Sequence, residues 1–284
     1  MNEADIVFLI NDRGNNNYRY RIKLMQILRD QNFDIRSIGL LKGLRALLNR
    51  KLNCFYFSSN IKCNIMVMLF NYQNSAIILN GLGRCRRSRM FIRFIGTLLY
   101  RYTGTVYVQN YCDYRYYRRY FKKEVEWIPG SGAQKRNVGT SNQFFTVSRN
   151  NKIYYQENEL SEFIDLFSVQ INVVGVTKSL SNDGMLSCGW VSQEEIFKYG
   201  NKMVWAAGYG DGLPHSLVDS LYNSLSVYIK RKEFINFGLR HIVTKKEQLP
   251  NNWIKIIVTQ RNLIDAQTVN VKYSQCITNW ASLK

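Results

Sequence analysis

Two carboxylates stand eight positions apart in the stretch GYGDGLPHSLVDS, residues 208–220. Asp211 lies in a glycine-rich turn, and Asp219 follows with His215 four positions before it. On a helix, His215 and Asp219 would share one face. The free amides at a helix start bind phosphate well, and carboxylates accept hydrogen bonds from sugar hydroxyls. The spacing therefore indicates a site for a phosphorylated ligand that carries hydroxyls, although one solvated loop acid and one solvated helix acid also fit it.

The neighbouring residues predict a strand, a turn and a helix around these acids. The apolar run KMVWAAG favours a buried strand, and YGDG then provides a turn at its carboxyl end. Pro214 suits the first helical position, because its φ is fixed and its missing amide costs no hydrogen bond there. Leu217, Val218 and Leu221 are spaced to pack inward. The start of this helix therefore lies beside the turn that carries the first acid.

The rest of the chain also alternates predicted strands with helices. In the first half, the strand candidates are DIVFLI, FDIRSIGL, CFYFSS, SAIILNG and GTVYVQN. A helix over YRYRIKLMQILRDQ is predicted between the first two of them. In the second half, helices over ENELSEFIDLF, SQEEIFKYG and PHSLVDSLYNS separate the strand candidates FFTVSR, INVVGV, KMVWAAG and LSVYIKR. This alternation predicts an α/β protein with parallel sheets, in which ligands bind outside the carboxyl ends of the strands.

A break in the pattern predicts two domains. Residues 124–143 contain Pro129, three glycines and several polar side chains between the two α/β halves. We expect domains over residues 1–125 and 126–284, with a cleft between them.

Composition narrows the class of partner. The chain of 284 residues has 39 basic and 20 acidic residues, a formal net charge of +19. Such a charge suits nucleic acid, an anionic membrane surface or phosphorylated substrates. Its six cysteines form no Cys-x-x-Cys pair and have no metal-like spacing with histidine, so we expect no metal site. The chain start does not read as a signal peptide, and no apolar run reaches the roughly 18 residues of a spanning helix. These features favour a reduced, cytoplasmic protein.

The segment DGLPHSLVD resembles the acidic-x7-acidic element of family-4 glycosyltransferases. The usual text of that family is Glu-Gly-Leu-Pro-Arg-Ser-Leu-Leu-Glu. Asp211 and Asp219 fall on the two glutamates and His215 falls on the arginine. The direct matches are Gly212, Leu213, Pro214, Ser216 and Leu217. The resemblance implies the GT-B fold, in which two Rossmann-like domains with parallel sheets face a central cleft.

Other segments resemble the same family in the same order. NGLGRCRRSRMF is similar to a Gly-Leu-Gly-Arg stretch of enzymes that build polysaccharide on a polyprenyl-diphosphate lipid. YVQNYCDYRYY is similar to a strand that ends in Phe-Gln-Asn followed by Asp, and WIPGSGAQ to the interdomain Ile-Pro-Gly-Ser-Gly-Val-Asp. SRNNK resembles the Arg…Lys phosphate clamp, and GWVSQEEI the loop beside the nucleotide base. The resemblance covers residues 5–235, and the joint match is more specific than any single piece.

The resemblance implies transfer of a sugar from a nucleotide-diphosphate donor, of UDP or GDP type, to a hydroxyl acceptor. The family works without a bound metal or other cofactor and usually with retention at the anomeric carbon. Arg149 and Lys152 would offset the charge of the leaving diphosphate, and Asp211 would hold hydroxyls of the donor sugar. Asp219 would accept the ribose hydroxyls. The implied donor-binding residues are Asp219, Gly212, Leu213, Pro214, His215, Ser216, Gly189, Trp190 and Val191.

The acceptor side is implied to lie in the first domain, at Arg13, Gly14, Asn110 and Asp113. Gly14 would let the backbone approach a phosphate or the acceptor.

Several positions depart from the family pattern. Both acids are Asp, which is shorter than Glu by about 1.5 Å, and Arg149 and Lys152 are closer together than in Arg-x4-Lys. Both histidines lie in the second half, and the GxPVIATD segment is not recognisable beyond residue 225.

A basic amphipathic segment, residues 84–102, indicates a membrane contact. Its arginines include Arg84, Arg86, Arg87, Arg89 and Arg93, and they stand among large apolar residues. Such a helix docks on anionic lipid, although an ordinary solvated helix has the same pattern. We therefore expect a peripheral enzyme on the inner face of the cytoplasmic membrane. It would act on a lipid-linked saccharide in O-antigen or capsule assembly and would not bind nucleic acid. Two alternatives remain: a basic nucleic-acid-binding α/β protein, and a non-catalytic subunit with the same fold.

Overall fold

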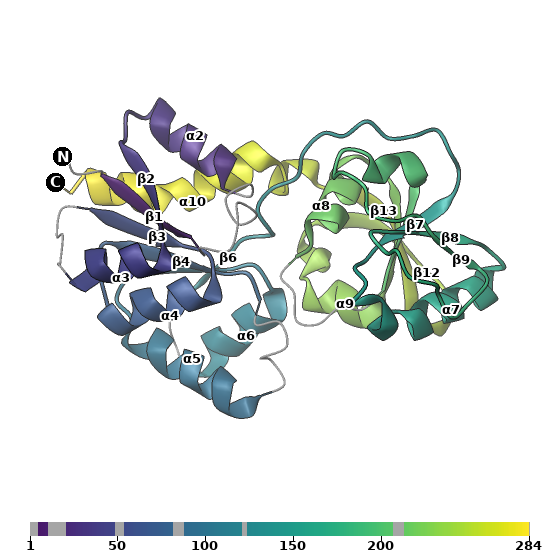
Figure 1. The fold of residues 1–284 in the computed structure, drawn as a ribbon, viewed down its shortest axis with the longest axis horizontal. Helices are drawn as coiled ribbons and strands as arrows, with labels where there is room; N and C mark the ends of the chain where they lie inside the picture. Colours follow the sequence, from purple (N-terminus) through teal and green to yellow (C-terminus); the bar gives the residue numbers. More distant parts are fainter. Residues whose placement is uncertain are drawn as a thin grey trace. The chain divides into compact units, whose positions relative to one another are not determined.

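The computed structural model describes residues 5–10, 21–48, 54–81, 88–120, 124–206 and 213–283, and these form two compact units (Figure 1). The first unit contains the described residues of Met1–Gly132 and Ala266–Lys284, together with Leu213. The second contains those of Ala133–Tyr209 and Pro214–Asp265. Each unit has its own sheet and its own core.

The first unit is built on a parallel sheet with the strand order β2-β1-β3-β4-β5-β6. Its strands are β1 (Ile6–Ile10), β2 (Ile35–Gly39), β3 (Phe55–Ser58), β4 (Ser75–Leu79), β5 (Thr105–Val108) and β6 (Glu126–Trp127). Every residue of β3 and β4 is buried, because helices cover both faces of the sheet. This explains why these strands are continuous apolar runs in the sequence.

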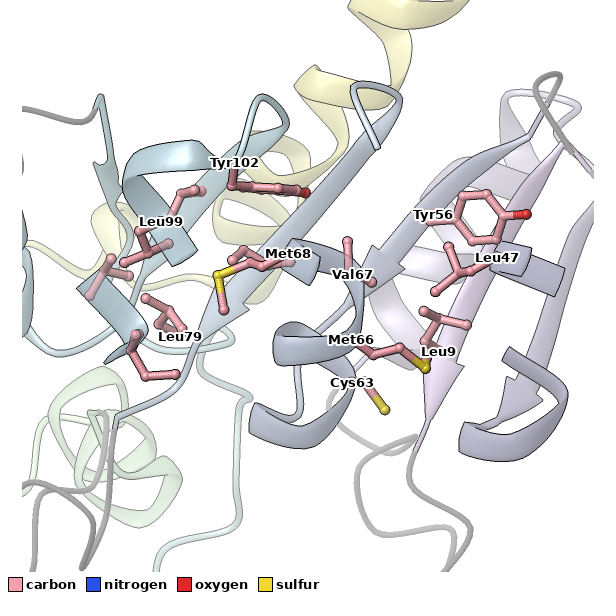
Figure 2. Packing of buried hydrophobic residues seen from close by; sticks show 14 of the residues in the cluster. Leu9, Leu47, Tyr56, Cys63, Met66, Val67, Met68, Leu79, Leu99 and Tyr102 are labelled. Atoms are coloured by element: carbon pink, nitrogen blue, oxygen red, sulfur yellow. The ribbon is translucent and has the colours of Figure 1, made fainter. Parts of the chain in front are cut away.

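Alternate residues of each strand point to two separate helical layers. Val7 and Leu9 face the layer of α3 (Leu40–Leu48), α4 (Ile61–Phe70), α5 (Arg89–Arg101) and α6 (Tyr111–Tyr120). Ile6 and Phe8 face α2 (Ile22–Asp30) and α10 (Ala266–Ala281). Figure 2 shows the core of the first layer, in which Leu47, Val67 and other buried side chains fill the space beside the sheet.

The last helix belongs to the first unit, which differs from the expected domain over residues 126–284. Val269, Tyr273 and Ile277 recur every four residues and are fully buried in the core of the first unit. The ring of Tyr273 lies edge-on to that of Tyr107 in β5, with centroids 5.1 Å apart. An apolar stripe at this spacing must be covered, and the first sheet covers it. The units accordingly change at Gly132 and again at Asp265.

The second unit has a mixed sheet with the strand order β12-β13-β11-β10-β7-β8-β9. Its strands are β7 (Phe144–Val147), β8 (Ile171–Val174), β9 (Met185–Ser187), β10 (Lys202–Trp205), β11 (Ser226–Lys230), β12 (Val243–Gln248) and β13 (Trp253–Thr259). The pairs from β9 to β11 are parallel, whereas β13 pairs antiparallel with β11 and β12. This antiparallel edge was not predicted from the sequence.

The helices of the second unit include α7 (Glu157–Phe167), α8 (His215–Tyr222) and α9 (Arg231–Asn236). The predicted helix over SQEEIFKYG was wrong in type, because the segment forms only a short 3-10 turn at Ile196–Tyr199. This turn buries Phe197, whose ring packs against Phe145. None of the helices described here has the length and apolar composition that crossing a bilayer requires.

Candidate functional site

Three neighbouring strands of the second unit end at one edge of its sheet. β7 lies between β10 and β8, and all three run parallel, so Ser148, Gly175 and Ala206 follow their carboxyl ends side by side. The amide of Ser148 donates to the carbonyl of Val174 at 2.9 Å, which continues the sheet pairing by one residue. This is the edge at which ligands of parallel α/β sheets gather.

A buried hydrogen-bond chain fixes this edge. The hydroxyl of Ser148 donates to Oε1 of Gln156, and Nε2 of Gln156 donates to the carbonyl of Ala206 at 3.2 Å. Ser148 and Gln156 are both buried, and Gln156 immediately precedes α7. The ends of β7 and β10 and the start of α7 are thus joined by one amide side chain. Because each of these buried groups has a partner, the chain stabilises the position of the edge.

A pair of glycines brings the loop 188–193 to the same edge. Gly175 has a φ of +89°, and a Cβ there would lie 2.4 Å from the carbonyl oxygen of Ser148. The amide of Gly175 donates to the carbonyl of Gly189 at 2.7 Å, and the amide of Gly189 donates to the carbonyl of Val176 at 2.8 Å. Gly175 therefore permits a backbone approach that a larger residue would block.

The loop after β7 carries Arg149 and Lys152, the predicted phosphate clamp. The carbonyl of Arg149 accepts from the amides of Lys152 at 2.8 Å and Ile153 at 3.0 Å, so a tight turn holds both residues at the edge. Arg149 is exposed. Asn150 fixes this loop against the loop after β8, because its side chain exchanges hydrogen bonds of 2.8 Å and 2.9 Å with the hydroxyl and amide of Thr177.

Asp219, the second predicted acid, is buried on α8 and already has partners. Its Oδ1 accepts from the amide of Gln134 at 2.9 Å, and its Oδ2 accepts from Nε of Arg136 at 3.1 Å. A side-chain hydrogen bond also joins it to Gln193, in the loop beside Gly189. Burial raises the pKa of the Asp219 carboxyl, and the Gln134 amide and the Arg136 guanidinium offset part of that rise.

Asn223 completes the attachment one helical turn later. Its Oδ1 accepts from the amide of Arg136, and its Nδ2 donates to the carbonyl of Gln134, both at 2.9 Å. Asp219 and Asn223 thus hold residues 134–136 against α8 through both main-chain and side-chain bonds. We call this group of four residues, Gln134, Arg136, Asp219 and Asn223, the α8 clamp.

The structure places the start of α8 close to the prediction. Pro214 is the N-cap residue and not the first helical residue, with φ −69° and ψ 142°, and the helix begins at His215. Leu213 is buried, whereas His215 and Ser216 are partly exposed. Of the predicted residues beside the base, Val191 is partly exposed and Trp190 is 81% exposed.

Several predicted residues lie outside the described part of the chain. These are Arg13, Gly14, Arg84, Arg86, Arg87, Asp211 and Gly212. Their roles stay predictions.

The predicted acceptor residues Asn110 and Asp113 follow β5 in the first unit. Oδ1 of Asn110 accepts from the amides of Cys112 at 3.0 Å and Asp113 at 3.2 Å, as an N-terminal helix cap does. Asn110 and Asp113 are both buried. Asn110 therefore has a structural task in starting α6, whatever else it contacts.

Sequence reasoning missed two arginines. Arg136 of the α8 clamp stands in the predicted interdomain stretch, and no local pattern links it to Asp219, which lies 83 positions away. Arg21, at the start of α2, is 3% exposed, and its Cζ lies 5.0 Å from the ring centroid of Tyr273. Among the described residues, its Nε and Nη1 have no hydrogen-bond partner, although the side chain hydrogen-bonds to Tyr273. Burial lowers the pKa of Arg21, and Tyr273 offsets part of that fall. Nothing in the sequence around Arg21 marks it as buried.

The structure resembles a solved protein that holds a nucleotide and a sugar. It matches the crystal structure of Anabaena HepE (Alr3699) in complex with UDP and glucose, with a TM-score of 0.62 and 10% sequence identity. The match covers 99% of this chain and 98% of that one. No family model and no curated protein sequence matches the chain. The predicted α/β fold of GT-B type is thereby confirmed. In the ranges that the structure describes, no three His, Cys, Asp or Glu side chains gather as a metal site would require.

Proposed function

We propose that the protein is a glycosyltransferase that uses a nucleotide-diphosphate sugar, of UDP or GDP type. One observation carries the proposal. The turn of Arg149 and the Gly175–Gly189 contact lie at one carboxyl edge, and α8 is the helix that follows β10, whose carboxyl end belongs to the same edge. The fold matches a UDP- and glucose-bound protein over nearly its full length. A nucleotide sugar needs these three things: cations, close backbone approach and helix-start amides.

Each group at the edge has a proposed task in transfer. Arg149 and Lys152 offset the charge that develops on the leaving diphosphate, and the amides of His215 and Ser216 add the partial positive charge of the helix start. Asp211 holds hydroxyls of the donor sugar. We propose transfer of a hexosyl group, with retention at the anomeric carbon and without a metal ion.

The α8 clamp refines the proposed role of Asp219. Both of its carboxylate oxygens already accept hydrogen bonds, and its side chain is 3% exposed. We propose that Asp219 contributes to donor binding largely through Arg136, whose guanidinium it holds by Nε. The terminal Nη groups of Arg136 then remain to donate to the nucleotide. Asp219 is a positioning residue in this scheme. Such a role through Arg136 is consistent with an aspartate at this position, which is shorter than the family's glutamate.

The acceptor is proposed to be a polyprenyl-diphosphate-linked saccharide of O-antigen or capsule assembly. The sequence resemblance supports this, together with the cationic first unit. The enzyme would then work as a peripheral protein at the inner face of the cytoplasmic membrane, with its acceptor side at Arg13, Gly14, Asn110 and Asp113.

Calorimetric and thermal-shift titration with UDP, GDP and UDP-glucose tests the donor proposal. A ligand at about a hundred times its Kd adds about 2.7 kcal/mol of stability, which raises Tm by a few degrees in a protein of this size. Arg149→Ala should abolish the shift by the diphosphates, and Lys245→Ala, an exposed change on β12, should leave it unchanged. A chain that no nucleotide stabilises would contradict the proposal. Binding without transfer would instead identify the non-catalytic subunit.

A further inference from the structure

In the layer α3–α6, the helices α3, α4 and α5 expose several large apolar side chains. Leu41 on α3 is 72% exposed, Leu69 on α4 is 62% exposed and Met90 on α5 is 83% exposed. Further exposed members are Leu44 and Leu48 on α3 and Phe94 and Tyr100 on α5. We call the exposed side chains of these four helices the outer helical face.

α3 exposes leucines on the side that faces away from the core. Gly43 and Leu47 face the core, and a Cβ on Gly43 would lie 2.8 Å from a methyl carbon of Leu9, so this helix packs closely on β1. Leu41, Leu44 and Leu48 recur at a spacing of three and four residues and are exposed. Lys42 and Arg45 of the same helix are also exposed, so the outward side of α3 combines leucines with cations.

α5 adds cations to the apolar side chains. Ile95 and Leu99 are fully buried against the sheet, and Figure 2 shows Leu99 in that core. The opposite side exposes Met90 and Phe94 between Arg89, Arg93 and Arg101. This alternation of cation and apolar side chain is typical of helices that lie at a lipid interface.

Charge is strongly one-sided over the whole layer. The four helices contain one acid, Asp113, and it is buried. Their nine cations are all exposed: Lys42, Arg45, Lys62, Arg89, Arg93, Arg101, Arg115, Arg118 and Arg119.

These helices form one continuous face. α3 contacts α4 and α4 contacts α5, and all three cover the same side of the first sheet (Figure 1). The leucines of α3 and the arginines of α5 therefore belong to one surface, although 40 positions separate the two helices in the sequence.

We infer that the outer helical face binds an anionic lipid bilayer, with the side chains of α3, α4 and α5 entering the interface between headgroups and acyl chains. The inference adds α3 and α4 to the membrane contact that the sequence had assigned to residues 84–102. It deepens the proposed function by naming the surface through which the enzyme would reach a lipid-linked acceptor. The binding itself does not depend on transferase activity.

The chemistry favours lipid over nucleic acid. A surface for single-stranded nucleic acid needs aromatic platforms for base stacking. Of the seven exposed large apolar side chains named above for the outer helical face, five are leucine or methionine and two, Phe94 and Tyr100, are aromatic. Leucine and methionine gain from contact with hydrocarbon, and each well-placed cation gains about fivefold in affinity at an anionic membrane surface.

Sedimentation with lipid vesicles tests the inference. The full chain should bind phosphatidylcholine vesicles that contain phosphatidylglycerol, and bind pure phosphatidylcholine at least tenfold more weakly. The pair Leu41→Ser with Leu48→Ser, and the pair Arg89→Glu with Arg93→Glu, should each lower binding by at least about tenfold. Matched controls lie on exposed positions of the second unit: Leu186→Ser with Ile257→Ser, and Arg231→Glu with Lys232→Glu. These controls should bind as the wild type does, and circular dichroism and Tm should show that every variant is folded.

Besides a failure of the wild type to bind vesicles, four results would overturn the inference. The first is vesicle binding that neither pair of substitutions weakens. The second is equal binding to neutral and anionic vesicles. The third is a dimer in sedimentation velocity that the serine pair dissociates while vesicle binding persists, which would make the face a contact between copies of the chain. The fourth is binding to a single-stranded oligonucleotide that exceeds vesicle binding and depends on the arginines alone.

Nucleotide titration of the same variants separates this inference from the proposed function. Unchanged nucleotide binding with lost vesicle binding supports both. If the wild type binds vesicles and no nucleotide, the donor proposal fails and the membrane surface stands. If the wild type binds nucleotide and no vesicles, the membrane inference fails and the donor proposal stands.

Discussion

Helices α5 and α7 do the same structural work with opposite charge. Each packs an apolar stripe on a sheet of its unit, with Ile95 and Leu99 buried on α5 and Phe163 and Ile164 on α7. The outward side of α5 carries arginines and no acid. α7 instead carries four acids, Glu157, Glu159, Glu162 and Asp165, and no Lys or Arg. The fold needs only the inward stripe, so the outward charge is free to serve function.

This contrast fits the different tasks that we propose for the two units. The first unit turns a cationic, partly apolar surface outward, which suits a large anionic surface. The second unit gathers its polar groups at one sheet edge, where buried bonds fix their positions, which suits a small ligand. A substitution in one unit that altered the task proposed for the other unit would break this division.

The largest effect is expected for Arg149→Ala. Without the guanidinium, the charge on the leaving diphosphate is no longer offset, so turnover should fall by about a hundredfold to a thousandfold. Steady-state kinetics with a nucleotide sugar measures this fall, and Lys245→Ala is the control. Vesicle binding should stay unchanged. A normal kcat for the alanine variant would remove Arg149 from the mechanism.

The next effect concerns the rigidity of the sheet edge. Gly175→Ala combines a φ of +89° with a clash against Ser148, and it should cost about 3 kcal/mol of unfolding free energy. Gly189→Ala has a φ of +70° but open space around the new Cβ, so about 1 kcal/mol is expected. Leu41→Ser on the outer helical face should change stability by less than about 0.5 kcal/mol.

Denaturant unfolding of these three variants measures the order of their losses in unfolding free energy. Equal losses for the two glycine variants would show that the contact with Ser148 does not constrain the edge.

A smaller effect is expected in the α8 clamp. Asp219→Asn and Arg136→Ala should each weaken donor binding about tenfold, and a double-mutant cycle should give a coupling of about 1–2 kcal/mol because the pair is nearly buried. KM should rise more than kcat falls, and Arg136→Lys should restore little, because lysine lacks the planar fork. Glu162→Gln, which removes the Lys230 ion pair away from the clamp, is the control. Additive losses would contradict the proposal that Asp219 acts through Arg136.

The smallest effect is a difference in salt dependence. Raising ionic strength from about 0.05 M to about 0.2 M should weaken vesicle binding severalfold, because exposed cations are screened. Nucleotide affinity should change less, because the proposed contact from Arg136 comes from a nearly buried side chain, whereas every cation of the outer helical face is exposed. Equal salt dependence of both equilibria would mean that one surface serves both ligands.

Sequence patterns predicted most elements that are buried on both sides. The strands β3, β4, β7 and β8 are short apolar runs, and such runs have few other stable environments in an α/β protein. β12 was missed because its six residues, VTKKEQ, are almost all exposed and show no apolar alternation. β12 forms as an edge strand because its main chain pairs with β13. The pattern of side chains does not predict this pairing.

The candidate site was predictable as residue types but not as contacts. DGLPHSLVD predicted the α8 start because Pro and Leu at these positions have local consequences for a helix. That Asp219 holds Arg136 across 83 positions has no local signal. The same is true of Gly175, whose need for glycine comes from the carbonyl of Ser148 in the neighbouring strand.

The sequence by itself determined the alternation of strands and helices and the excess of positive charge, and it named the groups that we propose to bind a diphosphate. These follow from single residues and short spacings. Tertiary structure alone decided that α10 returns to the first sheet, that the leucines of α3 join the arginines of α5 on one face, and that Asp219 is engaged within the α8 clamp. Each of these depends on which distant segments pack together, and packing is set by the burial of complementary apolar surfaces over the whole unit.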